Sequence, residues 1–202
     1  MGSSTGRPSP ATRVIVVTGP SGAGKGTLIR ALGESFSELE VAVSATTRAR
    51  REGEGNGRDY WFLSGDEFRE RIEAGEFLEH VTYVSGHRYG TLRSEIDRIA
   101  AEGKICVLEL ETEGALAVKR TVPGAVTIFI TAPLGELERR LRERATESAG
   151  EIGERVELAR RQMEQADEFD YVVVNDDRDR AAEELTRIVS RELNTAGSMT
   201  RP

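Results

Sequence analysis

Short runs of apolar, often β-branched residues alternate along the chain with longer stretches of mixed polarity. These runs predict five strands, at residues 14–17, 41–43, 105–110, 126–130 and 171–174. Because almost every position in the runs is apolar, we expect strands buried on both faces, as in a parallel sheet. Helix-compatible stretches lie between most of the runs, and strands that alternate with helices indicate an α/β fold with right-handed connections.

Two segments interrupt this alternation. Residues 46–91 contain most of the aromatic residues, with many Gly and Arg, and predict an inserted subdomain of short antiparallel strands plus one helix at 66–74. Residues 136–166 predict a lid of two helices joined by a polar, glycine-containing tip at 145–153. Apolar residues at helical spacing mark one face of each lid helix: Leu137 and Leu141 on the first, and Val156, Ala159, Met163 and Ala166 on the second.

The same pattern predicts the domain organisation. A chain of 202 residues can form one domain with a sizeable core. We expect a single domain over residues 13–193, which contains the insert, the lid and a core. The core comprises residues 13–45, 92–135 and 167–193. Residues 1–12 are rich in Gly, Ser, Pro and Thr and predict a disordered leader, whereas residues 194–202 predict a flexible tail.

Composition narrows the functional classes. The formal net charge of −7 argues against a nucleic-acid partner, because non-specific binding to phosphates needs a basic surface. Cys106 is the only cysteine, which excludes an intrachain disulfide and a Cys/His zinc set. The sequence has no apolar stretch long enough to span a membrane and no signal-peptide segment among its first twelve residues. We therefore expect a cytoplasmic protein with no nucleic-acid or membrane partner.

A glycine-rich segment directly follows the first predicted strand. In such a segment, backbone N–H groups can converge on one anion, and the helix that follows adds its positive N-terminal end. Lys25 would supply a mobile cation for the β- and γ-phosphates of ATP. The general P-loop has Ser or Thr after this lysine, whereas here Gly26 follows it, so the next residue, Thr27, is the candidate hydroxyl ligand for Mg²⁺. The predicted ATP-binding residues of this loop are Gly19, Pro20, Ser21, Gly22, Ala23, Gly24, Lys25, Gly26 and Thr27.

Two carboxylates end the third predicted strand. Glu109 and Glu111 stand where ligands bind in open α/β sheets, beyond the C-terminal ends of the strands. Carboxylates at that edge can hold the water ligands of Mg²⁺. We therefore predict that these two residues hold, through water, the Mg²⁺ that accompanies ATP.

The segment from Thr46 to Leu63 resembles the signature of guanylate kinases. It reads TTRARREGEGNGRDYWFL and fills the places of Thr-Ser/Thr-Arg, a later basic residue, an acid, a Gly, and Tyr-x-aromatic-aliphatic. The resemblance extends from about Val14 to Leu193, through GEFLE at 75–79, YGT at 89–91 and VNDD at 174–177. It implies a P-loop-type parallel sheet flanked by helices, with an inserted mixed-β GMP-binding subdomain and a helical lid. The implied activity is transfer of the γ-phosphoryl group of ATP to GMP, and to dGMP, with ADP and GDP as products for GMP.

The resemblance also implies how the acceptor nucleotide binds. Arg48, Arg51 and Tyr60 lie on one segment, and two guanidinium forks plus a phenol suit a dianionic phosphate. In guanylate kinases the matching residues hold the phosphate of GMP, so these three are assigned to it. Tyr89 is implied to assist at the phosphate, and the residues implied to contact guanine are Ser44, Glu79 and Thr91.

On the ATP side, the resemblance implies contributions from the lid and from the last strand. Arginines in the lid of guanylate kinases clamp ATP and the transferring phosphoryl group, and Arg140, Arg144 and Arg155 match them. Asn175 matches the family's adenine contact. The predicted catalytic residues are Lys25, Arg48, Arg140, Arg144 and Arg155. The family has Asp-x-Asp where this chain has Glu109 and Glu111, a departure that keeps the charge and lengthens the reach.

Two other hypotheses stay open. One is a non-catalytic guanylate-kinase-like domain that captures phosphorylated peptides, although such domains have a degraded P-loop and residues 19–25 are intact here. The other is a related P-loop kinase whose acceptor is a phosphorylated ribose, against which the complete segment 48–63 and Glu79 argue. Assays with different nucleoside monophosphates would discriminate among the three.

Overall fold

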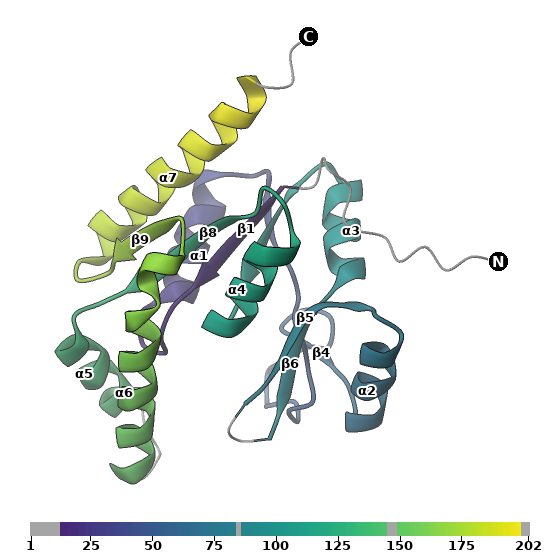
Figure 1. Ribbon diagram of the computed structural model, residues 1–202, viewed down its shortest axis with the longest axis horizontal. Helices are drawn as coiled ribbons and strands as arrows, with labels where there is room; N and C mark the ends of the chain where they lie inside the picture. Colours follow the sequence, from purple (N-terminus) through teal and green to yellow (C-terminus); the bar gives the residue numbers. More distant parts are fainter. Residues whose placement is uncertain (1–12, 84–85, 145–148, 199–202) are drawn as a thin grey trace. The chain divides into compact units, whose positions relative to one another are not determined.

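The computed structural model describes residues 13–83, 86–144 and 149–198, and within these ranges the side chains of 144, 149–151 and 195–198 are not described (Figure 1). The larger sheet has five strands in the order β2-β7-β1-β8-β9, and its outer pairs β2–β7 and β8–β9 are parallel. Its strands are β1 (Val14–Thr18), β2 (Leu39–Val41), β7 (Ile105–Glu109), β8 (Val126–Thr131) and β9 (Tyr171–Val174).

The predicted α/β sheet is confirmed, and its buried strands explain why. All five residues of β1 are buried, as are five of the six in β8, which fits a sheet covered on both faces. The expectation of full burial is wrong for the edge strands, because no residue of β2 and only Val173 of β9 is buried. The second strand differs from its prediction at 41–43, because β2 ends at Val41. The amide of Val43 donates to the Glu95 carboxylate at 3.1 Å, so the backbone leaves the strand pairing there.

The smaller sheet has four strands in the order β4-β3-β6-β5. Its strands are β3 (Ala45–Thr46), β4 (Trp61–Phe62), β5 (Phe77–Thr82) and β6 (Arg88–Leu92). The prediction of antiparallel strands is correct for β3–β6 and β5–β6 and wrong for β3–β4, which are parallel. The segment between β3 and β4 is long enough to carry the chain back to the same end of the sheet, which a parallel pair requires.

Helix α2 (Gly65–Glu73) packs on this smaller sheet. It begins one residue before the predicted helix because Ser64 and Glu67 form a capping box, in which each side chain accepts a hydrogen bond from the other's backbone amide. Phe68 of α2 is fully buried and stacks on Phe77 of β5 with ring centroids 4.4 Å apart. This apolar contact anchors the helix to the sheet that carries the predicted GMP residues.

Six further α-helices and one short 3₁₀ helix are formed by the described residues. They are α1 (Lys25–Ser35), α3 (Arg93–Ala101), α4 (Thr112–Thr121), α5 (Leu134–Arg144), α6 (Ala149–Glu164) and α7 (Arg178–Ser198), with a short 3₁₀ helix η1 (Ala166–Glu168). Helices α5 and α6 lie side by side, as predicted for the lid (Figure 1). Leu137, Leu141 and Ala159 of their predicted apolar faces are buried. None of the helices formed by the described residues is long and apolar enough to cross a membrane.

Two boundaries differ from the sequence prediction. The predicted lid tip at 145–153 is too long, because α6 already begins at Ala149; residues 145–148 lie outside the described residues. The predicted tail from 194 is helical up to Ser198, where α7 ends. Ala181, Leu185 and Val189 recur every four residues along α7 and are fully buried, so its apolar face fixes the helix. Residues 1–12 and 199–202 lie outside the described residues.

The described residues form two compact units. The first contains residues 13–15, 38–108 and 113–125, and therefore the smaller sheet. The second contains residues 16–37, 109–112 and 126–198, and therefore the glycine-rich loop and helices α5 and α6. The subdivision into a core, an insert at 46–91 and a lid at 136–166 stays a prediction.

Candidate active site

The glycine-rich loop of the second unit connects β1 to α1 and depends on glycine at specific points. Gly19, Gly22 and Gly24 have φ of 137°, 86° and 89°, a region that other residues rarely adopt. A Cβ on Gly19 would lie 1.9 Å from the carbonyl oxygen of Ile130, and one on Gly24 would lie 2.4 Å from Nδ2 of Asn175. The loop can therefore take this path only with glycine at both positions.

Lys25 is the first residue of α1 and folds back over the loop. Its Nζ donates to the carbonyl oxygens of Gly19 at 2.7 Å and Pro20 at 3.2 Å. An ammonium group has three N–H donors, so two are held by the protein and one can still reach a phosphate oxygen. The sequence prediction that Lys25 belongs to the phosphate loop agrees with this geometry.

A polar depression of about 280 Å³ opens at this loop. It is lined by Ser21, Gly22, Gly24, Lys25, Gly26, Thr27, Arg30 and Glu109. The structure therefore brings Glu109, from the end of β7, to the predicted phosphate-binding residues. Thr27 contributes a hydroxyl that accepts a hydrogen bond from Nη2 of Arg30 at 3.3 Å.

The two predicted metal-binding carboxylates differ in their surroundings. Glu109 is open to solvent, but protein atoms surround enough of its carboxylate that lost hydration raises its pKa, against the attraction of Lys25. The nearby charge of Glu111 raises that pKa further. Glu111 accepts a hydrogen bond from Nε2 of Gln162 on α6 at 3.2 Å. Within the described part of the chain, no group of three or more His, Cys, Asp or Glu side chains could by itself hold a metal ion.

Arg140 and Asn175 brace the same loop from other elements of the second unit. Arg140 on α5 donates through Nη1 to the Gly22 carbonyl at 3.3 Å and through Nη2 to the Asn175 carbonyl at 3.1 Å. Its Nε donates to Glu136 at 2.7 Å. The buried Asn175 side chain donates through Nδ2 to the Ala23 carbonyl at 2.7 Å, and its Oδ1 has no partner in the structure. The geometry gives both residues contacts with the loop backbone.

The other two predicted lid arginines, Arg144 and Arg155, lie on α5 and α6. The side chain of Arg144, at the end of α5, lies outside the described residues. Arg155 lies on α6 and is exposed. Their predicted contacts with ATP stay predictions, as does the contact of Asn175 with adenine.

In the first unit, Arg48 is held by an acid of the signature segment. Its Nη2 and Nη1 donate to the two carboxylate oxygens of Glu54 at 2.7 and 3.1 Å, a bidentate ion pair. The guanidinium carbon lies 5.4 Å from the ring centroid of Tyr60 and 5.7 Å from that of Phe62. Hydrogen bonding to Glu54, offset by partial burial, raises the pKa of Arg48, with a smaller contribution from the hydroxyl of Tyr89.

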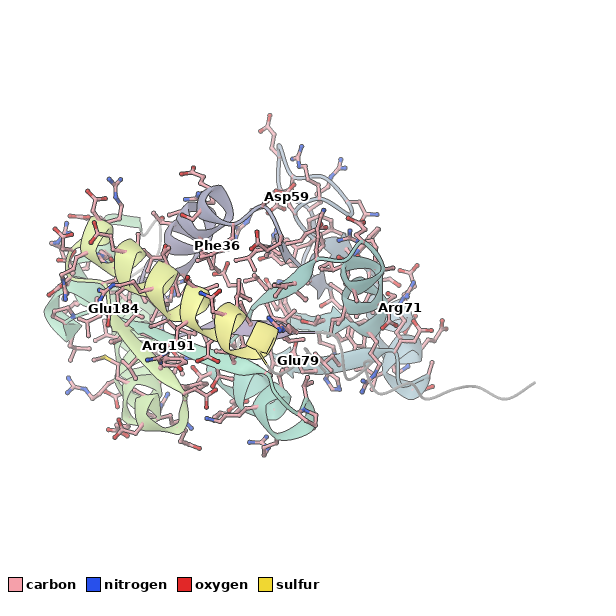
Figure 2. The ribbon with its side chains drawn as sticks, turned by 90° about the horizontal axis from the view of Figure 1, so that it is seen from above. Phe36, Asp59, Arg71, Glu79, Glu184 and Arg191 are labelled. Atoms are coloured by element: carbon pink, nitrogen blue, oxygen red, sulfur yellow. The ribbon has the colours of Figure 1, made fainter. Side chains whose placement is uncertain are left out.

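The aromatic residues predicted at the GMP phosphate cluster around this arginine. The rings of Tyr60 and Tyr89 meet edge to face with centroids 5.9 Å apart. Arg51 has an exposed side chain, and its backbone amide donates to Glu54 at 2.7 Å. Asp59 of the same segment, labelled in Figure 2, lies before β4. Its carboxylate accepts a hydrogen bond from the Gly55 amide at 2.7 Å. The structure thus brings Arg48, Tyr60 and Tyr89 together.

The predicted guanine-binding acid is buried. Glu79, which lies on β5 and is labelled in Figure 2, has an exposed fraction of 7%. It accepts a hydrogen bond from Oγ1 of Thr91 at 2.8 Å. Burial raises its pKa, whereas the hydrogen bonds from Thr91 lower it. A Cβ on Gly114 would lie 2.6 Å from Oε2 of Glu79, so this glycine leaves the space that the carboxylate occupies. Ser44 is half-buried, and its carbonyl accepts from the Trp61 amide at 2.9 Å.

Sequence reasoning missed the partners of these residues. The sequence indicates Glu54 only as the acid of the signature segment, and its spacing does not predict the bidentate ion pair with Arg48. Gln162 and Gly114 contact Glu111 and Glu79 across 51 and 35 residues of chain, and neither has a sequence signal of its own. Glu136 could have been found from its spacing of four residues to Arg140.

Comparison with known proteins identifies the family. The family model described as Guanylate kinase matches residues 11–192. The chain is 50% identical over 180 residues to a guanylate kinase of Rubrobacter xylanophilus, covering 89% of this chain and 94% of that protein. It is 45% identical over 182 residues to a guanylate kinase of Salinibacter ruber, covering 89% and 96%. The crystal structure of the Anaplasma phagocytophilum guanylate kinase matches with a TM-score of 0.69 and 29% identity, over 90% of this chain and 86% of that one. With its intact phosphate loop and its buried Glu79, this chain belongs to the guanylate kinase family.

Proposed function

We propose that this chain transfers the γ-phosphoryl group of ATP to GMP, giving ADP and GDP. The observation that carries the proposal is that one chain has both an intact phosphate loop and a buried carboxylate at the position predicted to contact guanine. The loop has its lysine folded over it, and Glu79 is buried with its carboxylate held by Thr91. The same observation argues against a non-catalytic binding domain, since such a domain has no use for Lys25 at the loop.

On the donor side, the loop would bind the triphosphate. The glycines of the loop and the start of α1 line the depression, so backbone amides there would bind the phosphates. The charge of Lys25 would offset the negative charge of the γ-phosphoryl group as it transfers. Arg140 is anchored to the loop through the Gly22 carbonyl, which would keep its charge near the phosphates. Arg144 and Arg155 would complete the clamp and exclude water, which would otherwise hydrolyse ATP.

The residues at the depression also fit Mg²⁺. Glu109 lines the same depression as Lys25 and Thr27, and one or two carboxylates with substrate phosphates and water are the usual surroundings of this ion. Mg²⁺ bound with ATP would neutralise charge on the β- and γ-phosphates. Glu109 and Glu111 would hold its water ligands, and Thr27 is the candidate hydroxyl. The hydrogen bond from Gln162 would orient Glu111 for this role.

On the acceptor side, Glu79 would select the base. Guanine presents two adjacent donors, N1–H and the N2 amine, and a carboxylate can accept from both in a charge-assisted pair. The hydroxyl of Ser44 would donate to O6, and Thr91 would fix the orientation of Glu79. Arg48, Arg51 and Tyr60, assisted by Tyr89, would hold the phosphate, so that a phosphate oxygen is free to attack the γ-phosphorus in line.

A coupled assay of ADP release tests the proposal directly. GMP, AMP, CMP and UMP are compared in parallel, with an acceptor-free reaction to measure background hydrolysis of ATP. We expect ADP release with GMP and a preference over AMP of about 10⁴-fold, the discrimination that a site built to hydrogen-bond a substrate group achieves. Binding of both nucleotides without ADP release would instead support the binding-domain hypothesis. Release only with a phosphorylated ribose as acceptor would support the other kinase.

A further inference from the structure

The carboxylate of Glu54 binds one edge of the Arg48 guanidinium, the edge formed by Nη1 and Nη2. Nη1 and Nη2 of Arg48 donate to Oε2 and Oε1 of Glu54, which is the end-on arrangement of a guanidinium and a carboxylate. Nη1 also donates to the carbonyl oxygen of Ala49 at 2.7 Å. The arginine side chain is 12% exposed and the glutamate side chain 19%, so the pair is shielded from most of the solvent.

Counting donors shows which edge of Arg48 is left for a ligand. A guanidinium has five N–H groups in one plane. Glu54 takes two of them and the Ala49 carbonyl takes the second N–H of Nη1. The two that these partners do not use are on Nε and Nη2, and the hydroxyl of Tyr89, itself predicted to assist at the GMP phosphate, also interacts with this guanidinium. These two N–H groups are parallel and lie along the side edge of the guanidinium, which is a second fork suited to two phosphate oxygens.

Glu54 also organises the segment that carries the other arginine. Its Oε2 accepts from the backbone amide of Arg51 at 2.7 Å, so one carboxylate ties together both predicted phosphate-binding arginines. The ion pair with Arg48, and then the Arg51 amide, lower the pKa of Glu54, so it keeps its charge at neutral pH. A long side chain that is already ordered loses little conformational freedom when a ligand binds.

We propose that Glu54 is a positioning residue for the acceptor phosphate: it holds the end-on fork of Arg48 so that the Nε–Nη2 edge receives the phosphate of GMP. This inference rests on the proposed function. The competing hypothesis is that Glu54 occupies the phosphate's own place on Arg48 and must be displaced. The two hypotheses predict opposite effects on GMP affinity when the charge of Glu54 is removed.

The test compares Glu54→Gln with the matched control Glu52→Gln. Glu52 is exposed and lies two residues away on the same segment, so the control removes the same charge without the contact to Arg48. We expect Glu54→Gln to raise the KM for GMP about tenfold and to leave the KM for ATP within twofold. Glu52→Gln should change neither. The inhibition constant of guanosine, which has no phosphate, should also stay within twofold in Glu54→Gln.

Measuring Glu54→Gln in an Arg48→Ala protein separates an effect on the position of Arg48 from a structural effect on the whole segment. If Glu54 acts through Arg48, then Glu54→Gln should add less than twofold to the KM for GMP once Arg48 is already Ala. A lower KM for GMP in Glu54→Gln would overturn the proposal in favour of competition. Equal weakening of GMP and guanosine, or a full tenfold effect in the Arg48→Ala background, would overturn it in favour of a structural role. Failure of the proposed function is distinct, because the unsubstituted enzyme would then show no GMP-dependent ADP release.

Discussion

Replacing Glu79 by Gln tests the proposed guanine-binding site, because it exchanges one carboxylate oxygen for an NH₂ group and hardly changes the volume of the side chain. The substitution removes the negative charge and half of the acceptor capacity, while the side chain keeps its length. In the structure Oε1 is already engaged by Thr91, so Oε2 is the oxygen with most capacity for the base. In the Gln variant an amide oxygen can keep the Thr91 hydrogen bond, but an NH₂ group would then face the guanine donors.

The expected loss follows from the type of hydrogen bond. Hydrogen bonds to a charged group contribute about 1.5–3 kcal/mol. At about 1.4 kcal/mol per factor of ten, this corresponds to a drop of roughly ten- to 150-fold in kcat/KM for GMP. AMP offers a lone pair at N1 and has no N2 amine, so it gains nothing from the carboxylate. We therefore expect its slow reaction to change by less than threefold in the variant.

The raised pKa of Glu79 adds two independent signatures. A carboxyl whose folded pKa lies above its unfolded value contributes stability that is present at low pH and is lost as the pH rises through the folded pKa. Glu79→Gln should therefore gain stability relative to the unsubstituted protein as the pH rises from 4 to 8. GMP needs the charged form, so the KM for GMP should rise as the pH falls through that raised pKa. The KM for GMP is measured against pH in both the unsubstituted protein and Glu79→Gln. The ratio of the two profiles removes the titration of GMP itself, which is the same in both.

The assays are kcat/KM for GMP and AMP in both proteins, and thermal unfolding between pH 4 and 8. The reasoning fails if Glu79→Gln lowers the GMP and AMP reactions by the same factor. It also fails if the unsubstituted enzyme uses AMP as readily as GMP. If Glu79→Gln is less stable than the unsubstituted protein at every pH, its loss of activity reflects damaged folding. Gly114→Ala, described below, then tests the position of the carboxylate separately, because its Tm is expected to change by only a few degrees.

Three further changes probe the other parts of the site. Lys25→Met keeps the stem and removes the charge, so turnover should fall by roughly two to four orders of magnitude with a modest change in ATP binding; a rate within tenfold of the parent would contradict its role. Gly114→Ala places a Cβ 2.6 Å from Oε2 of Glu79, so the carboxylate must shift, and kcat/KM for GMP should fall about ten- to a hundredfold while Tm changes by only a few degrees. Normal GMP kinetics would show that the site tolerates the shift. Glu111→Gln should raise the Mg²⁺ concentration needed for half-maximal rate, and an unchanged titration would leave Glu111 only its structural contact with Gln162.

The fold was largely predictable because the central strands β1 and β8 are buried on both faces. A continuous apolar run such as Val14–Val17 has few alternatives to a central strand, and the structure has β1 there. The errors lie where tertiary contacts decide. Strand β2 ends at Val41 because the Val43 amide donates its hydrogen bond to the Glu95 carboxylate. No local pattern predicts a partner that is 52 residues away in the sequence. The polar stretch after residue 148 forms the start of α6 despite its glycines, which the local composition does not predict.

The candidate site was predictable as a set of residue types and not as a set of contacts. A motif indicates Arg48 because phosphate recognition needs a guanidinium, but it does not indicate that Glu54 holds the end-on fork. Gly114 is another example: its role appears only when the Glu79 carboxylate is found in the space that a side chain would fill. Partners of this kind come from distant or unremarkable positions, and their effect depends on distances of a few tenths of an ångström.

The cations assigned to phosphates share one property that bears on catalysis. Lys25 is held by two loop carbonyls, Arg140 by Glu136 and the Gly22 carbonyl, and Arg48 by Glu54. Ordering a long charged side chain costs about 1.5–2 kcal/mol of rotamer freedom. Because acceptors from the protein already order these three, that loss falls on folding rather than on the encounter with substrate. The phosphates would then meet charges already in place, which is the condition under which electrostatic stabilisation of a transition state is most effective.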